Sequence, residues 1–189
     1  MKKVLKNSKY ILIILTASII ISIPLLKSNI DIYFDDGIQH ISRAYETYLE
    51  LQNKNNPKIL SNLTNGFGYS WDLFYGPLST ILILIANLII STFINSYKLV
   101  LFIGILLSGI TMYKFGSQLT KSKTVGTIAG VLYMTMPYHL NDMYIRNALG
   151  EFLSYIFIPL VFLGIYKLFN KEKGEWTLTL GAVRTNTYT

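Results

Sequence analysis

The sequence contains no cysteine and little charge, and both absences limit its chemistry. Without cysteine the chain can form neither a disulfide nor a thiolate metal site. Only 14% of the 189 residues are charged, whereas soluble domains carry about 25%. Because so little charge is available to face water, the sequence excludes an ordinary soluble domain.

Long apolar blocks take the place of the missing charge, and the mean hydropathy is +0.40. The blocks lie at 10–26, 78–94, 99–113, 124–137 and 152–169. Each approaches the roughly 20 apolar residues that cross a bilayer as a helix. The sequence therefore predicts an all-α membrane protein, in which residues 1–169 form the transmembrane region and residues 170–189 a polar tail.

The net charge of +7 is gathered at the edges of these blocks and leaves no basic, aromatic-rich surface for DNA or RNA. Lysine and arginine in such positions orient helices in the membrane. We therefore expect the lipid bilayer, and no nucleic acid, as a partner. The run 10–26 has a basic start but no small-residue cleavage site, which favours an uncleaved anchor with a cytoplasmic amino terminus. The Ile, Lys and Asn bias suggests a bacterium, and hence its plasma membrane.

The number of crossings depends on the block at 78–94. If all five blocks cross, 6 of the 17 Lys and Arg residues lie inside; if 78–94 enters and leaves on one face, 11 lie inside. The positive-inside rule favours the second arrangement. The sequence thus predicts four transmembrane helices plus one re-entrant or juxtamembrane helical segment, with five spans as the alternative. Segments 27–98 and 138–151 then share the external face.

Two adjacent carboxylates, Asp35 and Asp36, follow the first span. From Gly37 onward, apolar residues recur at three- and four-residue spacing, which predicts an amphipathic interfacial helix in the first external loop. Asp36 is suited to cap this helix, and the two carboxylates could also share a divalent cation, with His40 as a further ligand. The polar face of the helix is expected to be solvated: Gln39, Arg43, Glu46 and Glu50.

Glycines and aromatic residues alternate from residue 65 to residue 78, directly before an apolar block. Trp and Tyr commonly lie at headgroup level, so an interfacial belt explains this segment as well as a binding platform for a sugar or a prenyl chain. On the second interpretation, Tyr69, Trp71 and Tyr75 are the candidate contacts with an acceptor or a lipid.

The segment 138–151 joins two apolar blocks and contains Arg146 and Glu151. Arginine suits phosphate because its planar fork binds two oxygens and stays charged. A glutamate at the edge of a span requires a partner or a water-filled cavity. Either Arg146 and Glu151 form a structural ion pair, or they belong to a binding site.

The order of these features resembles the start of a GT-C-type membrane glycosyltransferase: an inside amino terminus, one span, an acidic pair and an interfacial helix. Bacterial membrane proteins of the YfhO kind, and those labelled "6-pyruvoyl-tetrahydropterin synthase-related", are still more similar, although no pterin chemistry is evident. The similarity covers roughly residues 9–169. It is carried by three motifs: Asp35-Asp36-Gly37-Ile38-Gln39-His40, Phe74-Tyr75-Gly76-Pro77-Leu78 and Arg146-Asn147-Ala148-Leu149-Gly150-Glu151-Phe152.

The resemblance implies transfer of a sugar from a polyprenyl-phosphate donor to an external acceptor. Asp35 or Asp36 would then act as the catalytic base or hold a divalent metal ion, and Arg146, with Glu151 beside it, would contact the donor phosphate. Proteins of this type have many more spans, so the chain is expected to be an amino-terminal fragment, truncated or frameshifted. The alternatives are a non-catalytic lipid-binding or transport protein, and an inactive fragment. The nearly charge-free spans count against transport.

Overall fold

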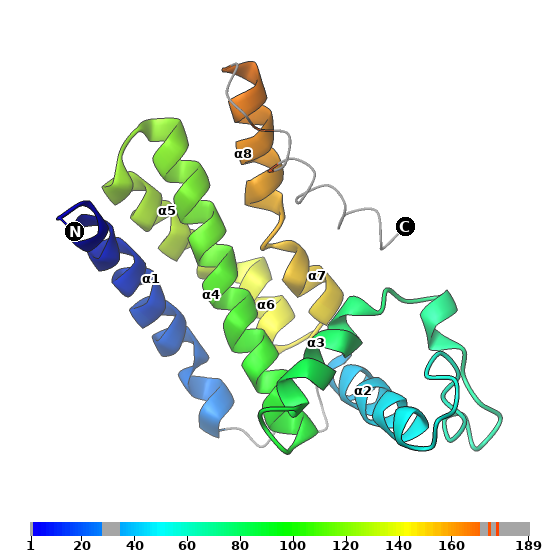
Figure 1. Ribbon diagram of the computed structural model, residues 1–189. Coiled ribbons are helices and arrows are strands. Elements are labelled where there is room, and N and C mark those ends of the chain that lie inside the picture. The colour runs from blue at the N-terminus through cyan, green and yellow to red at the C-terminus, as the bar shows by residue number, and fades with distance from the viewer. Residues whose placement is uncertain (1, 28–34, 171–173, 175–176, 178–189) are drawn as a thin grey trace.

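Helices make up the regular structure of the chain in a computed structural model, which describes residues 2–27, 35–170, 174 and 177 (Figure 1). Within these residues there is no strand, only an isolated antiparallel bridge between Leu60 and Tyr69. The elements are α1 (Lys2–Lys27), α2 (Gly37–Gln52), the 3-10 turn η1 (Trp71–Leu73), α3 (Leu78–Asn87), α4 (Phe93–Thr120), α5 (Lys123–Met134), α6 (Pro137–Tyr144), α7 (Leu149–Ser154) and α8 (Ile158–Phe169).

Three helical segments are long and apolar enough to cross a membrane: Ser8–Leu26 within α1, Phe93–Thr120, and Leu149–Phe169, which joins α7 and α8. They contain the predicted spans 10–26, 99–113 and 152–169. The prediction of an all-α membrane protein is therefore confirmed at this level.

The predicted span 124–137 is divided between two helices, α5 and α6. The 12 residues of α5 rise about 18 Å, whereas the hydrocarbon core of a bilayer is about 30 Å thick. Pro137 stands in the first turn of α6, where its missing N–H is harmless but where it interrupts a continuous helix. For this reason the block is not one of the three long candidate spans.

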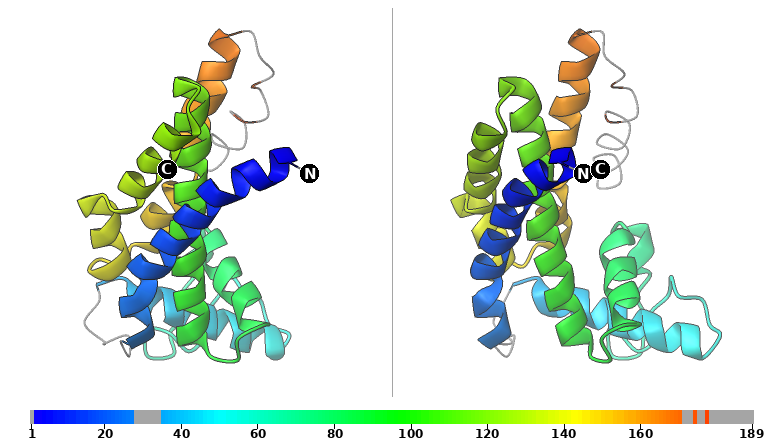
Figure 2. Two further views of the ribbon diagram at one scale, coloured as in Figure 1. Left: turned by 90° about the vertical axis from the view of Figure 1, so that its left-hand side faces the viewer. Right: turned by 60° about the vertical axis from the view of Figure 1, so that its left-hand side comes forward.

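The block at 78–94 forms the 10-residue helix α3, which is only about 15 Å long. Both views in Figure 2 show α3 beside α2 at the end of the bundle where α1 ends and α4 begins. This end is called the α2–α3 end below. The other end carries the start of α1, the turn between α4 and α5, and the carboxyl end of α8.

Helix α4 is the centre of the bundle and packs against α1, α3, α5 and α8. Its closest neighbour is α5, which returns along it after a tight turn. Lys121 adopts a left-handed conformation (φ 55°) and Ser122 caps α5 by accepting the N–H of Val125. A Cβ atom at Gly126 would lie 2.7 Å from the carbonyl oxygen of Tyr113, so the absence of a side chain permits this approach.

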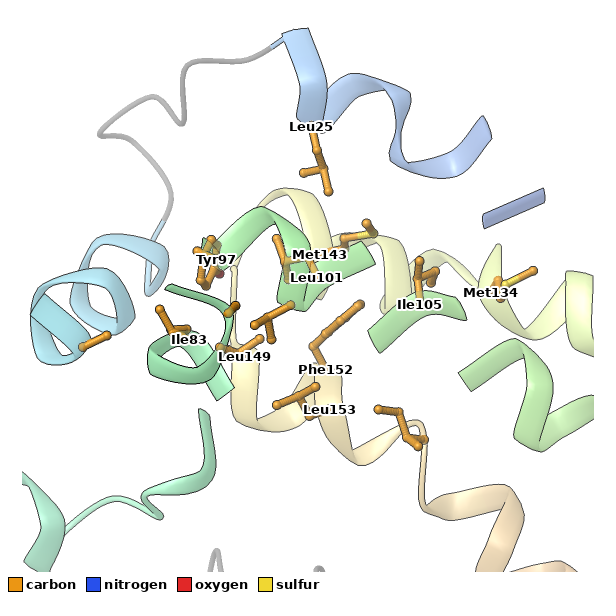
Figure 3. Close-up of a cluster of buried hydrophobic side chains, with 14 of the residues drawn as sticks. Leu25, Ile83, Tyr97, Leu101, Ile105, Met134, Met143, Leu149, Phe152 and Leu153 are labelled. Carbon is orange, nitrogen blue, oxygen red and sulfur yellow. The ribbon is translucent and has the colours of Figure 1, made fainter. Parts of the chain in front are cut away.

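The apolar core lies between α4 and the elements around it. Figure 3 shows that its side chains come from distant parts of the sequence, including Tyr97 and Leu101 of α4 and Leu149 and Phe152 of α7. All four are fully buried. This packing fixes α7 against α4, and α6 packs on α7 and α5. The polar residues of the segment 138–151 are positioned in this way.

The predicted helix after Asp36 is present as α2, but its polar face differs from the prediction. Glu50 is only 2% exposed. One of its carboxylate oxygens accepts the backbone N–H of Ser61 and the other accepts the side-chain N–H of Asn55, each at 2.8 Å. The loop after α2 therefore folds over a residue that was expected to be solvated. The exposed face of α2 carries Ile38, Tyr45 and Tyr48, as an interfacial helix requires.

We expect the Glu50→Gln variant to loosen the loop between α2 and η1. The amide of glutamine would place a donor against either the Ser61 N–H or the Asn55 amide, so one of the two hydrogen bonds would be lost. Limited proteolysis in detergent micelles should then cut residues 53–70 several-fold faster. Glu46→Gln is the matched control, because Glu46 makes one exposed contact, with Asn62. Equal cleavage rates in both variants would contradict the anchoring role of Glu50.

Candidate functional site

The two polar segments that the sequence places on one face meet at the α2–α3 end of the bundle. The backbone N–H of Asp36 donates to the carbonyl oxygen of Arg146 at 2.9 Å. Gly37 lies against the side chain of Asn147, which a Cβ atom on Gly37 would approach to 3.2 Å. The predicted proximity of the acidic pair to Arg146 is therefore observed.

Asn147 fixes the turn that carries Arg146. Its backbone has φ +53°, a conformation that asparagine tolerates better than most residues. Its side-chain oxygen accepts a 2.9 Å hydrogen bond from the hydroxyl of Tyr97, which is fully buried in α4. The turn is thus attached to the central helix of the bundle.

Arg146 is the centre of a polar cluster. Its Nη1 atom donates to Oδ1 of Asp142 at 2.9 Å, to Oε2 of Glu151 at 2.8 Å and to the hydroxyl of Tyr138 at 2.6 Å. The Tyr138 hydroxyl in turn donates to Oε1 of Glu151 at 2.6 Å. The Arg146–Glu151 pair that the sequence left as an alternative is therefore formed.

The two carboxylates of this cluster differ in burial. The Asp142 side chain is 0% exposed, whereas the side chains of Glu151 and Arg146 are 40% and 38% exposed. Burial, and after it the nearby charge of Glu151, raise the pKa of Asp142 to about 6, although Arg146 acts in the opposite direction. Asp142 thus contacts Arg146 on the buried side of the cluster, and Glu151 contacts it on the exposed side, together with Tyr138.

Among the described residues, the hydrogen bonds and ion pairs of the Arg146 side chain all use the same nitrogen, Nη1. They leave Nη2 and Nε, the other donors of the guanidinium, to other acceptors. Two parallel N–H donors on one planar group match the oxygens of a phosphate or carboxylate. A half-exposed arginine held at one corner is therefore able to bind an anion with its remaining edge.

Asp35 and Asp36 are exposed. Asp36 stands at the N-cap of α2, as predicted, but its carboxylate makes no capping hydrogen bond. The side chain is therefore not used in starting the helix. Both carboxylates lie beside the turn that carries Arg146 and are accessible to a molecule at that surface.

His40 points inward from α2 and is 1% exposed. Its Nε2 atom accepts the backbone N–H of Leu149 at 3.3 Å, and its ring meets the ring of Tyr75 edge to face. Burial lowers the pKa of His40 to about 4, with the charge of Arg43 as a second cause. Within the described residues, no group of three or more His, Asp or Glu side chains is arranged to hold a metal ion, so the predicted ligation by His40 and Asp36 stays a prediction.

The second histidine, His139, is fully buried and stacked on Tyr155, with 4.1 Å between ring centroids. Its Nδ1 atom lies 3.2 Å from the carbonyl oxygen of Tyr133. Burial lowers its pKa to about 4. The buried ring therefore packs α6 against Phe152 of α7 and Tyr155.

The three aromatic candidates lie in different environments. Trp71 is 3% exposed and donates its ring N–H to the carbonyl oxygen of Pro57, so it closes the loop on itself. Tyr69 pairs with Leu60 in the isolated bridge. Tyr75 lies under the guanidinium of Arg43, 4.6 Å from the ring centroid. The most exposed aromatic side chains of the loop are instead Phe67 and Phe74, at 90% and 75%.

The sequence predicted no role for Tyr138, Asp142, Tyr97 or Asn147. A signal existed for the first two, because residues 138, 142 and 146 are spaced by four and so fall on one side of a helical segment. No local pattern marks Tyr97, which is one of many apolar residues in α4. Its contact with Asn147 spans 50 positions in the sequence.

Comparison with known proteins gives one family and one relative. Residues 73–184 match the family described as "6-pyruvoyl-tetrahydropterin synthase related domain; membrane protein". An uncharacterized protein of Lactococcus lactis subsp. cremoris (strain MG1363) is 29% identical over 171 residues, which is 88% of this chain and 28% of that protein. The chain thus spans less than a third of the length of this relative. No solved structure gives a significant match.

Proposed function

The chain belongs to the 6-pyruvoyl-tetrahydropterin synthase-related family of membrane domains, and from its polar site we propose that it transfers a sugar from a polyprenyl-phosphate donor to an acceptor. The observation that carries the proposal is the hydrogen bond from the Asp36 N–H to the Arg146 oxygen. It brings exposed carboxylates and a half-exposed guanidinium to one surface, and the two groups offer a base and an anion site.

We place this surface on the external face of the bacterial plasma membrane. The proposal uses the four predicted crossings at 10–26, 99–113, 124–137 and 152–169, so that α6 beyond Pro137 stays at the external face. Helix α3 stays at the α2–α3 end, which its short length supports. The amino terminus and the turn 121–122 then lie on the cytoplasmic side, in agreement with the greater number of Lys and Arg residues there.

Arg146 would bind the donor phosphate with Nη2 and Nε. Charge on the phosphate increases as the sugar leaves, so a fixed cation at this position stabilises the transition state more than the ground state. Glu151 and Tyr138 contact the same guanidinium and would form the exposed edge of the phosphate site. The prenyl chain would extend from there into the bilayer.

Asp35 or Asp36 would act as the general base. The carboxylate takes the proton of an acceptor hydroxyl, the acceptor oxygen bonds to the anomeric carbon of the sugar, and the bond from that carbon to the phosphate oxygen breaks. The bond electrons leave with polyprenyl phosphate, whose charge Arg146 offsets. The two exposed carboxylates fit this role because an incoming acceptor can reach them.

A divalent metal ion was a further expectation for this site. This stays a prediction: Nε2 of His40 already accepts the Leu149 N–H and the ring is buried, whereas Asp36 is exposed. We therefore assign no step to a metal ion. The positive charge in the proposal comes from Arg146.

The test is sugar transfer by membranes that contain the full chain. The probes are polyprenyl-phosphate-linked hexoses with a labelled sugar, and the measurement is release of polyprenyl phosphate together with labelled product. The double variant Asp35→Asn, Asp36→Asn is expected to lower the rate about a hundredfold or more, because it removes the base. The backbone contact to Arg146 is retained in this variant.

Glu46→Gln is the control, since it removes a half-buried carboxylate of α2 that makes no contact with the Arg146 cluster among the described residues. Transfer that persists in the double variant would refute the role of the acidic pair. A wild-type chain that transfers no sugar from any of the donors, yet retains polyprenyl phosphate on the membrane, would favour the non-catalytic lipid-binding function.

A further inference from the structure

A cavity lies between α1 and α4, at the α2–α3 end of the bundle. Its volume is about 560 Å³, within the range of about 300–1,000 Å³ typical of ligand pockets. It is called the α1–α4 groove here. Both of its walls belong to candidate membrane spans, so the groove opens toward lipid.

The groove is polar at one end and apolar along the rest of its length. Asn95 and the half-buried Lys98 line it in the first two turns of α4, whereas Phe102 lies about 14 Å beyond the first residue of that helix at 1.5 Å per residue. On α1, Leu26 is near the helix end and Ile19 lies two turns deeper. The groove therefore complements a phospholipid: the lysine at its opening matches the negatively charged phosphate, and the apolar side chains below it match one acyl chain.

A buried hydroxyl adds a second polar feature. The side chain of Ser22 lines the groove, and the residue is 7% exposed. Its Oγ atom has no hydrogen-bond partner among the described residues. Buried hydroxyl groups without a partner are uncommon, and the ester carbonyl of a lipid, which lies just below the phosphate, would supply one.

The α1–α4 groove is separate from the Arg146 cluster. Side chains on a helix advance by about 100° per residue, so Asn95 and Phe102 project from the side of α4 roughly opposite to Tyr97. Lys98 projects about 100° away from Tyr97. Tyr97 points to Asn147, next to Arg146. A prenyl chain whose phosphate is bound at Arg146 would have to pass around α4 to enter the groove.

We propose that the α1–α4 groove binds one acyl chain of an anionic membrane phospholipid, whose phosphate contacts Lys98 and whose ester carbonyl accepts a hydrogen bond from Ser22. The commitment to an anionic phospholipid rests on charge complementarity with Lys98 at the membrane surface. This proposal is independent of sugar transfer, because the residues that line the groove are not those of the Arg146 cluster.

The experiment uses the full chain, purified in detergent and incubated with either phosphatidylglycerol or the zwitterionic phosphatidylcholine. Native mass spectrometry measures how much of each lipid stays bound. We expect Lys98→Gln to weaken phosphatidylglycerol binding about fivefold, corresponding to about 1 kcal/mol for one surface lysine, and to leave phosphatidylcholine unchanged. Ser22→Phe fills the groove and should remove both lipids.

Two controls match these variants. Lys54→Gln removes an exposed lysine of the loop after α2, and Ile128→Phe adds the same ring on a lipid-facing position of α5 outside the groove. Neither should alter lipid retention. In the wild-type chain, a photoactivatable phosphatidylglycerol should attach to residues 19–26 and 95–102, which tests the site without any variant.

Three results would overturn the proposal. The first is unchanged phosphatidylglycerol binding in both Lys98→Gln and Ser22→Phe. The second is competitive displacement of phosphatidylglycerol by polyprenyl phosphate in the groove, which would make the groove part of the donor site. The third is crosslinking of residues 95–102 to another polypeptide chain in place of the lipid.

Discussion

Replacing Arg146 with Ala is expected to lower the rate of sugar transfer by a hundred- to a thousandfold. This is the order of loss, about 10²–10³, seen when one fixed donor to a developing negative charge is removed. The same change should lower the free energy of unfolding by about 2–3 kcal/mol, because it leaves the Asp142 carboxylate buried without its partner. The cost stays below that of a fully buried pair, since the Arg146 side chain is 38% exposed and Asp142 can bind a proton.

The stability loss should depend on pH in a defined direction. The pKa of Asp142 is about 6, above its ordinary value of 3.8, and removal of Arg146 would raise it further. A carboxyl group with a raised folded-state pKa is stabilising below its unfolded pKa, and this stability is lost as pH rises through the folded-state pKa. Thermal unfolding in micelles should therefore show the Arg146→Ala variant to be more stable at pH 5 than at pH 8.

The double variant Asp142→Asn, Arg146→Gln separates structure from chemistry. It replaces the ion pair with two neutral groups that can hydrogen-bond, so the unfolding temperature should return toward that of the wild type. Sugar transfer should stay low, because no cation faces the donor phosphate. Recovery of transfer together with stability would show that Arg146 is only structural. Near-normal transfer in Arg146→Ala would refute the phosphate role directly.

Replacing Gly126 with Leu should open the contact between α4 and α5. A Cβ atom there would lie 2.7 Å from the Tyr113 carbonyl oxygen and 2.8 Å from the backbone nitrogen of Ser117, and backbone atoms cannot rotate away. Overpacking of this kind costs about 1–3 kcal/mol for small insertions, and leucine adds more than one carbon. Leucine has a better helix propensity than glycine, which offsets about 1 kcal/mol of this cost. We therefore expect the free energy of unfolding to fall by about 3 kcal/mol in total.

Circular dichroism during thermal unfolding in micelles measures this loss. Gly126→Ala should give a smaller decrease than Gly126→Leu, because only the Cβ atom must be accommodated. Val125→Leu is the control, since the neighbouring side chain is 45% exposed and faces away from α4. Equal unfolding temperatures for Val125→Leu and Gly126→Leu would mean that α5 does not pack on α4 in this way.

The positions of the helices were largely predictable because apolar blocks and proline positions are local signals. The blocks at 10–26, 99–113 and 152–169 all lie in long candidate spans. The division of 124–137 followed from Pro137, which was visible in the sequence but was counted as the end of a span and not as the start of α6. The block at 78–94 forms the 10-residue helix α3, and the re-entrant arrangement that the Lys and Arg positions favour stays a prediction.

The site was predictable only in part. Asp36 and Arg146 were expected on one face, and a hydrogen bond joins them. The burial of Glu50 and Asp142 could not be read from the sequence, because both were on helices whose polar residues have water as their default neighbour. Burial depends on which other segment packs on top, namely the 53–61 loop over Glu50 and α7 beside Asp142. Such contacts between distant segments have no periodic pattern that predicts them.

The contact that joins the two polar segments belongs to the main chain on both sides, from the amide of residue 36 to the carbonyl of residue 146. Every residue except proline supplies that amide. The architecture of this surface therefore does not depend on which side chain stands at position 36. Relatives could exchange the carboxylate for another group during evolution, and so change the acceptor they recognise, while the two loops stay joined.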